Sequence, residues 1–279
     1  MELTQQTYQK LRDFIHELTG IVFSDNKKYL LENRLRSRIQ ELGLQSFEEY
    51  YQYLQRSSLN ARTEINKLFD AITINETYFF RNEAQFNALR TVILPEILQR
   101  KKLQGTVRIW SAGCSTGEEP YTIAMIVREH FLRRFPRVRF EILANDISPS
   151  VLEKAKRGEY RTYAIRSLPK EYLDKYFTRT PNGTYVIKDE IRQMVKFFQM
   201  NLKDEQQMRR MHNIDVIFCA NVLIYFSPEV KEQIVNNFYR ALNPGGFLFI
   251  GYSESLIGMN TKFRMRQLPR TVVYYKPEE

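Results

Sequence analysis

Apolar positions in the first seventy residues recur at steps of three and four. Because residues three and four apart share one face of an α-helix, this spacing predicts helices with one buried face each. Ser46 followed by Glu49 is typical of a capping box that opens a further helix. Residues 1–72 are therefore predicted to form a small all-helical N-terminal domain. The periodic positions are Leu11, Phe14, Leu18, Leu31, Leu35, Ile39 and Leu42.

The pattern changes at about residue 105, where short apolar runs begin to alternate with amphipathic runs. Near-continuous apolar strands that alternate with helices indicate a mostly parallel sheet covered on both faces. Residues 105–279 are therefore predicted to form a Rossmann-like α/β domain, with residues 73–104 as the segment that joins it to the helices. The strand-like runs are 106–113, 138–148, 214–226 and 243–252, and the helical runs are 118–135 and 227–242.

One segment interrupts this alternation. Asn182-Gly183 lies between two β-rich stretches, and this dipeptide is a strong signal for a two-residue hairpin turn. We therefore expect a small antiparallel β subdomain inserted at about residues 157–198.

A glycine-containing loop, "SAGCSTGEEPY" at residues 111–121, follows the first strand-like run. Gly113 and Gly117 permit close approach of the backbone to a ligand at the carboxyl end of a parallel sheet. The loop lacks the G-x-G-x-x-G spacing of dinucleotide sites, and Glu118 and Glu119 would repel a pyrophosphate. They suit a ligand that carries positive charge, such as the sulfonium and amino groups of S-adenosylmethionine. Alternatively, the two acids only stabilise the start of the helix.

Two further signals point to a nucleoside ligand. Asp146 ends the second apolar run, where a carboxylate can accept hydrogen bonds from a ribose. The segment "ALNPGGFLFIGY" resembles the L-x-P-G-G turn and strand common in S-adenosylmethionine-dependent methyltransferases. Together with the loop, these features predict a site for S-adenosylmethionine.

Composition and charge narrow the class of protein. With 43% hydrophobic residues, a chain of 279 residues can bury a full core. No apolar run is long enough to span a membrane, and the first residues lack the apolar stretch of a signal peptide, so we expect a cytoplasmic protein without membrane insertion. Two cysteines and three scattered histidines predict neither disulfides nor a metal site.

The formal charge of +10 favours an acidic partner, either a nucleic acid or a protein. The excess charge lies in local clusters rather than in one long tract. Within one of them, Lys27, Arg34 and Arg38 fall at spacings of seven and four, which places them on one helical face. This face is either a solvated surface or a docking surface for an acidic helix.

Three separated motifs identify a family. "INETYFFRN" at residues 74–82, "STGEEPY" at 115–121 and "CANVLIYF" at 219–226 stand in this order along the chain. They resemble the N-x-T-x-F-F-R, G-E-E-P-Y-S and R-N-V-x-I-Y-F motifs of the bacterial chemotaxis receptor methyltransferases, the CheR family. The resemblance covers essentially the whole chain. It implies transfer of a methyl group from S-adenosylmethionine to receptor glutamates, which leaves S-adenosylhomocysteine as the other product.

The resemblance also assigns residues. Arg81 and Tyr225 are expected nearest the transferred methyl group. Two positions depart from the family pattern: Ala220 stands where arginine is usual, and Thr122 replaces a serine. The first puts any role of that arginine in doubt. The expected cofactor contacts are Asn75, Thr77, Arg81, Gly113, Gly117, Glu118, Asp146, Asn201, Leu202, Ala220 and Asn221.

The chemistry is consistent with such a site. A glutamate carboxylate is already ionised near pH 7, so its attack on a sulfonium methyl requires no general base. Catalysis then rests on positioning and on the exclusion of water. Arg81 could orient the incoming carboxylate or could bind only the cofactor carboxylate. Tyr225 could donate a hydrogen bond there or could serve only in packing.

The family resemblance also implies partners. They are the cytoplasmic helical bundles of chemoreceptors, with recruitment to receptor arrays. In some members a C-terminal receptor pentapeptide adds a strand to the β subdomain, and Arg179 is a candidate contact for it or a plain surface residue. Two other functions remain open. A nucleic-acid methyltransferase would need a base-stacking platform that we do not find, and a non-catalytic sensor of S-adenosylmethionine is distinguished only by turnover.

Overall fold

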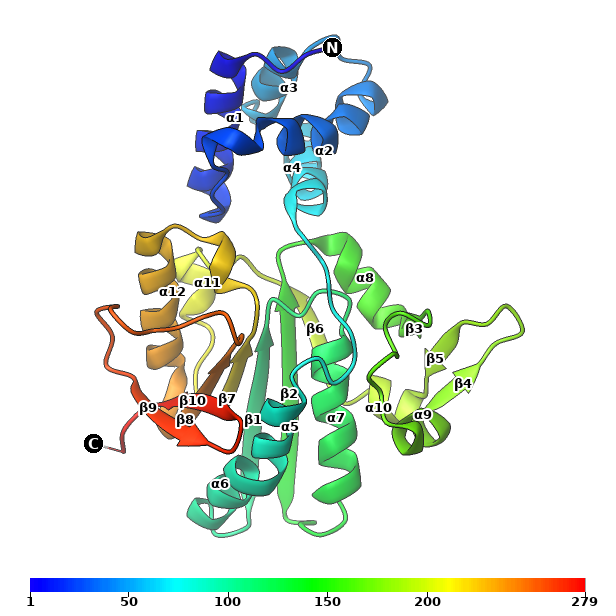
Figure 1. Ribbon diagram of the computed structural model, residues 1–279, viewed down its shortest axis with the longest axis vertical. Coiled ribbons are helices and arrows are strands. Elements are labelled where there is room, and N and C mark those ends of the chain that lie inside the picture. The colour runs from blue at the N-terminus through cyan, green and yellow to red at the C-terminus, as the bar shows by residue number, and fades with distance from the viewer. Residues whose placement is uncertain (279) are drawn as a thin grey trace.

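The computed structural model describes residues 1–278 and has three parts (Figure 1). A cluster of helices at the N-terminus lies above a central α/β domain, against the end of the sheet at which β1 and β2 finish. A small β subdomain projects from the side of the central domain, beyond α7 and α8. The Rossmann-like architecture predicted from the sequence is confirmed, with the N-terminal helices and the small antiparallel sheet that were expected beside it.

The N-terminal helices share a core of their own, in which Leu11, Leu31 and Leu35 of the periodic positions pack with Tyr8 and Tyr50. Ser46 caps α3 as expected, because its hydroxyl accepts a hydrogen bond from the Glu49 amide. The Glu49 carboxylate accepts from the amide of Gln45 rather than of Ser46, so the box is shifted by one residue. The elements are α1 (Gln5–Thr19), η1 (Asp25–Lys27), α2 (Lys28–Glu41), α3 (Phe47–Leu54) and α4 (Leu59–Ile72).

The joining segment is more structured than a linker. After an irregular stretch at 73–82, it forms a continuous helical run that packs on the sheet, where Phe86 stacks on Phe218 with ring centroids 5.6 Å apart. The run consists of α5 (Glu83–Ala88), η2 (Leu89–Ile93) and α6 (Leu94–Arg100).

The central sheet has seven strands in the order β6-β2-β1-β7-β8-β10-β9. β6, β2, β1, β7 and β8 run parallel, whereas β10 is antiparallel to both of its neighbours. The strands are β1 (Gly105–Ala112), β2 (Val138–Asp146), β6 (Val195–Gln199), β7 (Ile214–Cys219), β8 (Leu242–Ile250), β9 (Arg264–Leu268) and β10 (Thr271–Tyr275).

Two apolar cores lie on the two faces of this sheet. One joins alternate strand residues such as Ile109 and Phe218 to α5 and α7 (Glu118–His130). The other joins Trp110 and Ile217 to α12 (Pro228–Ala241). Burial on both faces explains why the strands read as near-continuous apolar runs. The remaining helical elements here are α8 (Pro149–Arg157), α11 (Glu205–Met208) and η3 (Leu223–Tyr225).

The predicted hairpin is present, because β4 and β5 pair antiparallel across Asn182 and Gly183. The predicted end of the inserted subdomain at about residue 198 is wrong. Val195–Gln199 forms β6, which pairs parallel with β2 in the central sheet. The subdomain therefore ends before Val195. Its elements are β3 (Glu159–Tyr160), α9 (Lys170–Tyr176), β4 (Phe177–Arg179), β5 (Tyr185–Ile187) and α10 (Asp189–Arg192).

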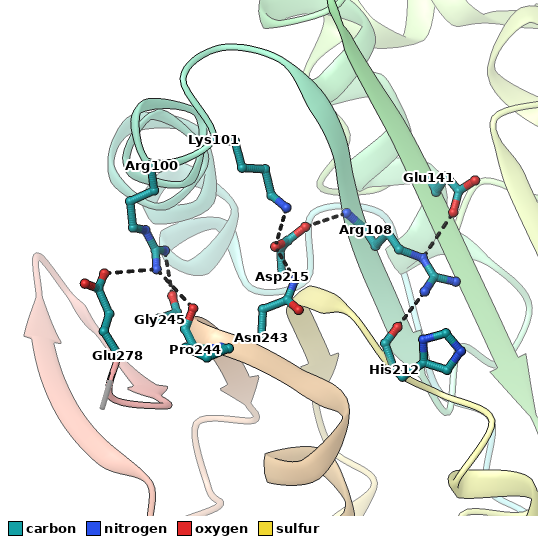
Figure 2. A network of polar contacts seen from close by, with 10 residues as sticks. All are labelled: Arg100, Lys101, Arg108, Glu141, His212, Asp215, Asn243, Pro244, Gly245 and Glu278. Atoms are coloured by element: carbon teal, nitrogen blue, oxygen red, sulfur yellow. Dashed lines mark hydrogen bonds and ion pairs between the residues drawn. The ribbon is translucent and has the colours of Figure 1, made fainter.

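A polar network ties together the amino ends of three strands (Figure 2). The buried Asp215 carboxylate accepts hydrogen bonds from the Arg108 amide at 2.9 Å and the Asn243 side chain at 2.8 Å. The Lys101 ammonium lies 3.0 Å from the same carboxylate, so the buried charge is paired. The network fixes this end of the sheet and leaves the carboxyl ends of the strands for a site. Within residues 1–278, no helix has the length and apolar content needed to cross a membrane.

Candidate active site

A cavity lies at the carboxyl ends of β1, β2 and β7, where a Rossmann-like sheet binds its ligands. Its atom-free space, including the open mouth, is about 1290 Å³, which is ample for a nucleoside-sized ligand. Three parts of the chain contribute to its wall. The predicted site residues that line it are Asn75, Thr77, Arg81, Gly113, Asp146, Asn201, Leu202, Ala220, Asn221 and Tyr225.

Gly113 shows why the first turn requires glycine. Its φ is 77°, in the left-handed region that favours glycine. A Cβ there would lie 2.6 Å from Cγ2 of Val222. The amides of Gly113 and Cys114 both donate to the Asn145 carbonyl, which fixes the loop across two strands. The loop can therefore pack closely on the 221–225 turn only without a side chain at Gly113.

Gly117 and Glu118, both expected to contact the cofactor, do not line the cavity. Gly117 serves as the N-cap of α7 with a φ of 93°. The Glu118 carboxylate is buried and accepts a hydrogen bond from the Thr116 hydroxyl at 2.7 Å. Burial raises the pKa of Glu118 to about 7. The direct contacts with the cofactor that were expected of Gly117 and Glu118 therefore have no counterpart in the cavity wall.

Glu119 lines the cavity instead. Burial raises the pKa of Glu119 to about 7, against the lowering effects of a hydrogen bond from Ser111 and of the Arg81 charge. The Ser111 hydroxyl donates to its carboxylate at 2.6 Å. Glu119 is thus an acid held in an apolar setting at the cavity wall. In the sequence, Glu118 and Glu119 both stand at the start of the same helix. This pattern did not show which of the two carboxylates faces the cavity.

Asp146 is buried at the end of β2, as predicted. One of its carboxylate oxygens accepts a hydrogen bond from the Ser115 amide at 2.9 Å, and the other from the Ser148 amide at 3.0 Å. Burial raises its pKa, while these backbone hydrogen bonds lower it. The carboxylate therefore joins the glycine-containing loop after β1 to the loop after β2.

Arg81 and Tyr225 lie at the same cavity, from the 73–82 segment and from η3 respectively. The Arg81 guanidinium donates to the Glu76 carbonyl, which turns it back along its own segment. Burial raises the pKa of Tyr225, and the nearby Arg81 charge opposes that shift. The structure therefore brings together the two side chains that the sequence analysis expected beside the reacting groups.

The helical domain forms part of the wall, which the sequence analysis missed. Thr19, Ile21 and Ile72 line the cavity. The Asn201 side chain donates to the Leu18 carbonyl at 2.7 Å, and the Ile21 backbone bridges to Phe226. Contacts between residues so distant in sequence have no local signal, which explains why they were not predicted.

The expected docking stripe on α2 does not exist as one free surface. Lys27 is exposed at the start of the helix. Arg34, however, donates to the Ile72 carbonyl at 2.5 Å, where it holds the end of α4. Arg38 is paired with Glu64, with a closest distance of 2.7 Å and side-chain exposures of only 15% and 4%. Arg38 is therefore engaged by a carboxylate of its own domain and is not a free cation of the expected stripe, and its docking role stays a prediction.

Arg179 is exposed on β4, with its guanidinium 5.8 Å from the centre of the Tyr185 ring. The two cysteines, Cys114 and Cys219, are buried and unpaired, and burial raises the pKa of each thiol. Such thiols are poor nucleophiles. Within residues 1–278, no cluster of three or more His, Cys, Asp or Glu side chains is arranged to hold a metal ion.

The cavity fits S-adenosylmethionine. Glu119 and Asp146 supply negative charge for a cationic ligand, and Arg81 supplies a partner for its carboxylate. Ile147, Leu202 and other apolar side chains offer surface for the adenine ring. The residues that would hold the cofactor come from the helical domain, the 73–82 segment and the central domain.

Comparison with known proteins identifies the chain. Residues 75–272 match the family described as "CheR methyltransferase, SAM binding domain", and residues 6–73 match "CheR methyltransferase, all-alpha domain". Chemotaxis protein methyltransferase 2 of Vibrio cholerae is 37% identical over 277 residues, which cover 99% of this chain and 95% of that protein. Chemotaxis protein methyltransferase 1 of Pseudomonas aeruginosa is 36% identical over 277 residues, which cover 98% and 99%.

Both family domains occur in the expected order, and together they span nearly the whole chain. The first holds the helices that close the cavity, and the second holds the loops that form its floor. S-adenosylmethionine is therefore the cofactor of the protein, which is an enzyme that transfers its methyl group. The chain belongs to the CheR methyltransferase family of chemotaxis proteins.

Proposed function

We propose that the protein methylates the side-chain carboxylates of glutamates on the cytoplasmic helical bundles of chemoreceptors. One observation carries this proposal. A single cavity combines two acids, the half-buried Glu119 and the buried Asp146, with Arg81 and Tyr225, which can meet an incoming carboxylate. The relatives described above are chemotaxis protein methyltransferases, which favours a receptor as the substrate.

The lining residues suit a carboxylate acceptor. When bound, S-adenosylmethionine supplies a methyl group on a positively charged sulfur. A carboxylate nucleophile needs no base near pH 7, and none of the lining residues that the structure describes is His or Lys. An amine acceptor would instead have to lose a proton before it could attack. The composition of the wall thus favours an oxygen acid over an amine as the acceptor.

Each side chain has a proposed role. Asn75, Thr77, Asp146, Asn201 and Asn221 hold the cofactor, together with the backbone at Gly113, Leu202 and Ala220. Arg81 orients a carboxylate by charge-assisted hydrogen bonds, and Tyr225 donates a hydrogen bond to the acceptor. Alignment of the reacting atoms in a water-excluded site can supply several kcal/mol of the barrier reduction.

The parts of the chain divide the work. Residues 1–72 close the cofactor cavity and approach the receptor, with Lys27 as an exposed cation available to an acidic helix. Residues 73–104 bring Arg81 to the cavity, and residues 105–279 hold the cofactor. Arg179 lies on β4, an edge strand of the small sheet, and is available to a receptor tail that would add a strand there. These contacts would bring the enzyme to receptor arrays.

The experiment is methyl transfer from labelled S-adenosylmethionine to receptor cytoplasmic fragments. Label should enter the intact fragment and should be lost when the acceptor glutamates are replaced with alanine. A fragment with matched charge but scrambled sequence is the control. Equal labelling of all three fragments would remove the proposal of a specific receptor glutamate.

A further inference from the structure

Glu254 lies in the loop after β8 and binds three backbone amides. One carboxylate oxygen accepts from the Asn221 amide at 2.9 Å and from the Gly251 amide at 2.6 Å. The other accepts from the Ile224 amide at 3.1 Å. No ion pair involves Glu254 within residues 1–278. The carboxylate is therefore used entirely on backbone groups, and two of these belong to the 221–225 turn.

This turn needs such support. Asn221 has a φ of 62°, a left-handed conformation that a residue with a side chain adopts at a cost in free energy. Gly251 packs directly beneath it. A Cβ at Gly251 would lie 2.8 Å from the Asn221 amide nitrogen and 2.9 Å from the Glu254 carboxylate. Gly251 and Glu254 thus hold the turn together, and Val222 of the same turn packs closely on Gly113.

The turn carries residues that serve both sides of the cavity. Asn221 stands at its start among the proposed cofactor contacts, and Tyr225 stands at its end among the proposed acceptor contacts. The Glu254 charge also reaches both regions, since it raises the pKa of Glu119 and of Tyr225, although burial is the larger cause in each. Displacement of the turn would therefore disturb both binding regions together.

We propose that Glu254 is a positioning residue whose carboxylate fixes the 221–225 turn and so holds the cofactor contact at Asn221 in register with the acceptor contact at Tyr225. The inference rests on the proposed function of this cavity. Glu254 does not itself line the cavity. Its influence passes through the backbone of the turn.

The test compares Glu254→Gln with Glu232→Gln in the full chain. Glutamine keeps the shape but directs an amide N–H₂ at a backbone N–H, so at least one hydrogen bond is lost. Glu232 is the matched control, because its carboxylate also accepts a hydrogen bond from a backbone amide of the loop after β8, that of Asn260 at 3.4 Å. This contact lies outside the 221–225 turn. S-adenosylhomocysteine affinity is measured by calorimetry, and methyl transfer is measured at saturating cofactor on a receptor fragment.

Glu254→Gln should weaken S-adenosylhomocysteine binding about tenfold and lower kcat about tenfold, the scale of a charged hydrogen bond, whereas Glu232→Gln should change neither. Gly251→Ala tests the same support of the turn without altering the charge and should give the same paired loss. Wild-type-like values in both Glu254→Gln and Gly251→Ala, or an equal loss in the control, would overturn the proposal. Failure of the wild-type chain to methylate the fragment would instead count against the proposed function.

Discussion

The Ser148 hydroxyl donates a hydrogen bond to the Asp70 carboxylate, with 2.5 Å between the oxygens, and thereby joins the helical domain to the loop after β2. The Ser150 amide donates to the same carboxylate oxygen at 3.1 Å. Ser148 in turn donates its amide to Asp146 at the cavity wall. The helical domain therefore contributes to the geometry of the cavity as well as to its enclosure.

Asp70→Ala should weaken S-adenosylhomocysteine binding about tenfold. The loss of a hydrogen bond to a charged group costs about 1.5–3 kcal/mol, and we expect part of this cost to reduce the free energy of cofactor binding. Asp70→Asn keeps an acceptor for Ser148 and should retain most of the affinity. The control is Asn66→Ala on the same helix as Asp70, which removes an exposed hydrogen bond donated by the Gln199 side chain of β6. Calorimetry on the three variants checks this. Equal affinities for Asp70→Ala and Asn66→Ala would contradict a role of Asp70 in the site.

Cofactor affinity should depend on pH through Glu119. Burial raises the pKa of this carboxyl to about 7, so it is largely protonated at pH 6 and largely ionised at pH 8. Only the ionised form attracts a cationic ligand. Affinity for S-adenosylmethionine should therefore rise between pH 6 and 8 and level off above that range.

The Glu119→Gln variant should lack the rise in affinity between pH 6 and 8 and should bind S-adenosylmethionine weakly at all pH values. Glu118→Gln is the matched control, because burial raises the pKa of Glu118 to about 7 as well, but its carboxylate does not line the cavity. The control should keep most of the pH dependence. A wild-type profile in Glu119→Gln would show that another group is responsible.

Arg38→Ala should destabilise the protein by about 3–5 kcal/mol, the cost of leaving one member of a buried ion pair alone. Among the residues that the structure describes, the Glu64 carboxylate would then keep only the Tyr50 hydroxyl as a hydrogen-bond partner, at 2.8 Å. Urea unfolding of the full chain measures the free energy. Lys27→Ala, which changes an exposed cation, should leave stability within about 0.5 kcal/mol. A small effect at Arg38 would contradict a stabilising role of its ion pair with Glu64.

Tyr225→Phe should lower kcat about tenfold or more while leaving S-adenosylhomocysteine affinity unchanged, because the hydroxyl is proposed to act on the acceptor alone. Tyr252→Phe is the control, since that exposed tyrosine lies on the neighbouring loop after β8. Steady-state kinetics on a receptor fragment and calorimetry separate the two quantities. A parallel loss of cofactor affinity in Tyr225→Phe would assign the hydroxyl to the cofactor instead.

Local patterns explain what the sequence predicted well. Apolar runs located β1, β2, β7 and β8, and the Asn182-Gly183 turn located the hairpin. β6 was assigned to the wrong unit, because five residues directly after an insertion carry no signal of their partner strand. The antiparallel pair β9 and β10 was not predicted as such, since its pairing depends on the end of the completed sheet.

The same distinction between local and long-range signals applies to the candidate site. Arg81, Asp146 and Tyr225 could be placed at the cavity from the sequence, because each stands in a recognisable local motif. Helical spacing placed Arg38 on a polar face but carried no information about Glu64, which lies on another helix. Glu254 gave no signal either, because its role depends on amides that are brought to it only by the folded chain. Sequence patterns therefore predict single elements, whereas pairings between elements require the structure.

The most direct test of the central claim is the chemical stability of the transferred methyl group. Receptor-bearing membranes are labelled with the enzyme and methyl-labelled S-adenosylmethionine, and the receptor band is then treated with alkali. Carboxyl methyl esters hydrolyse in base, so we predict that the label leaves as volatile methanol. Label that stays on the receptor band through alkali would show methylation of an amine and would contradict the account.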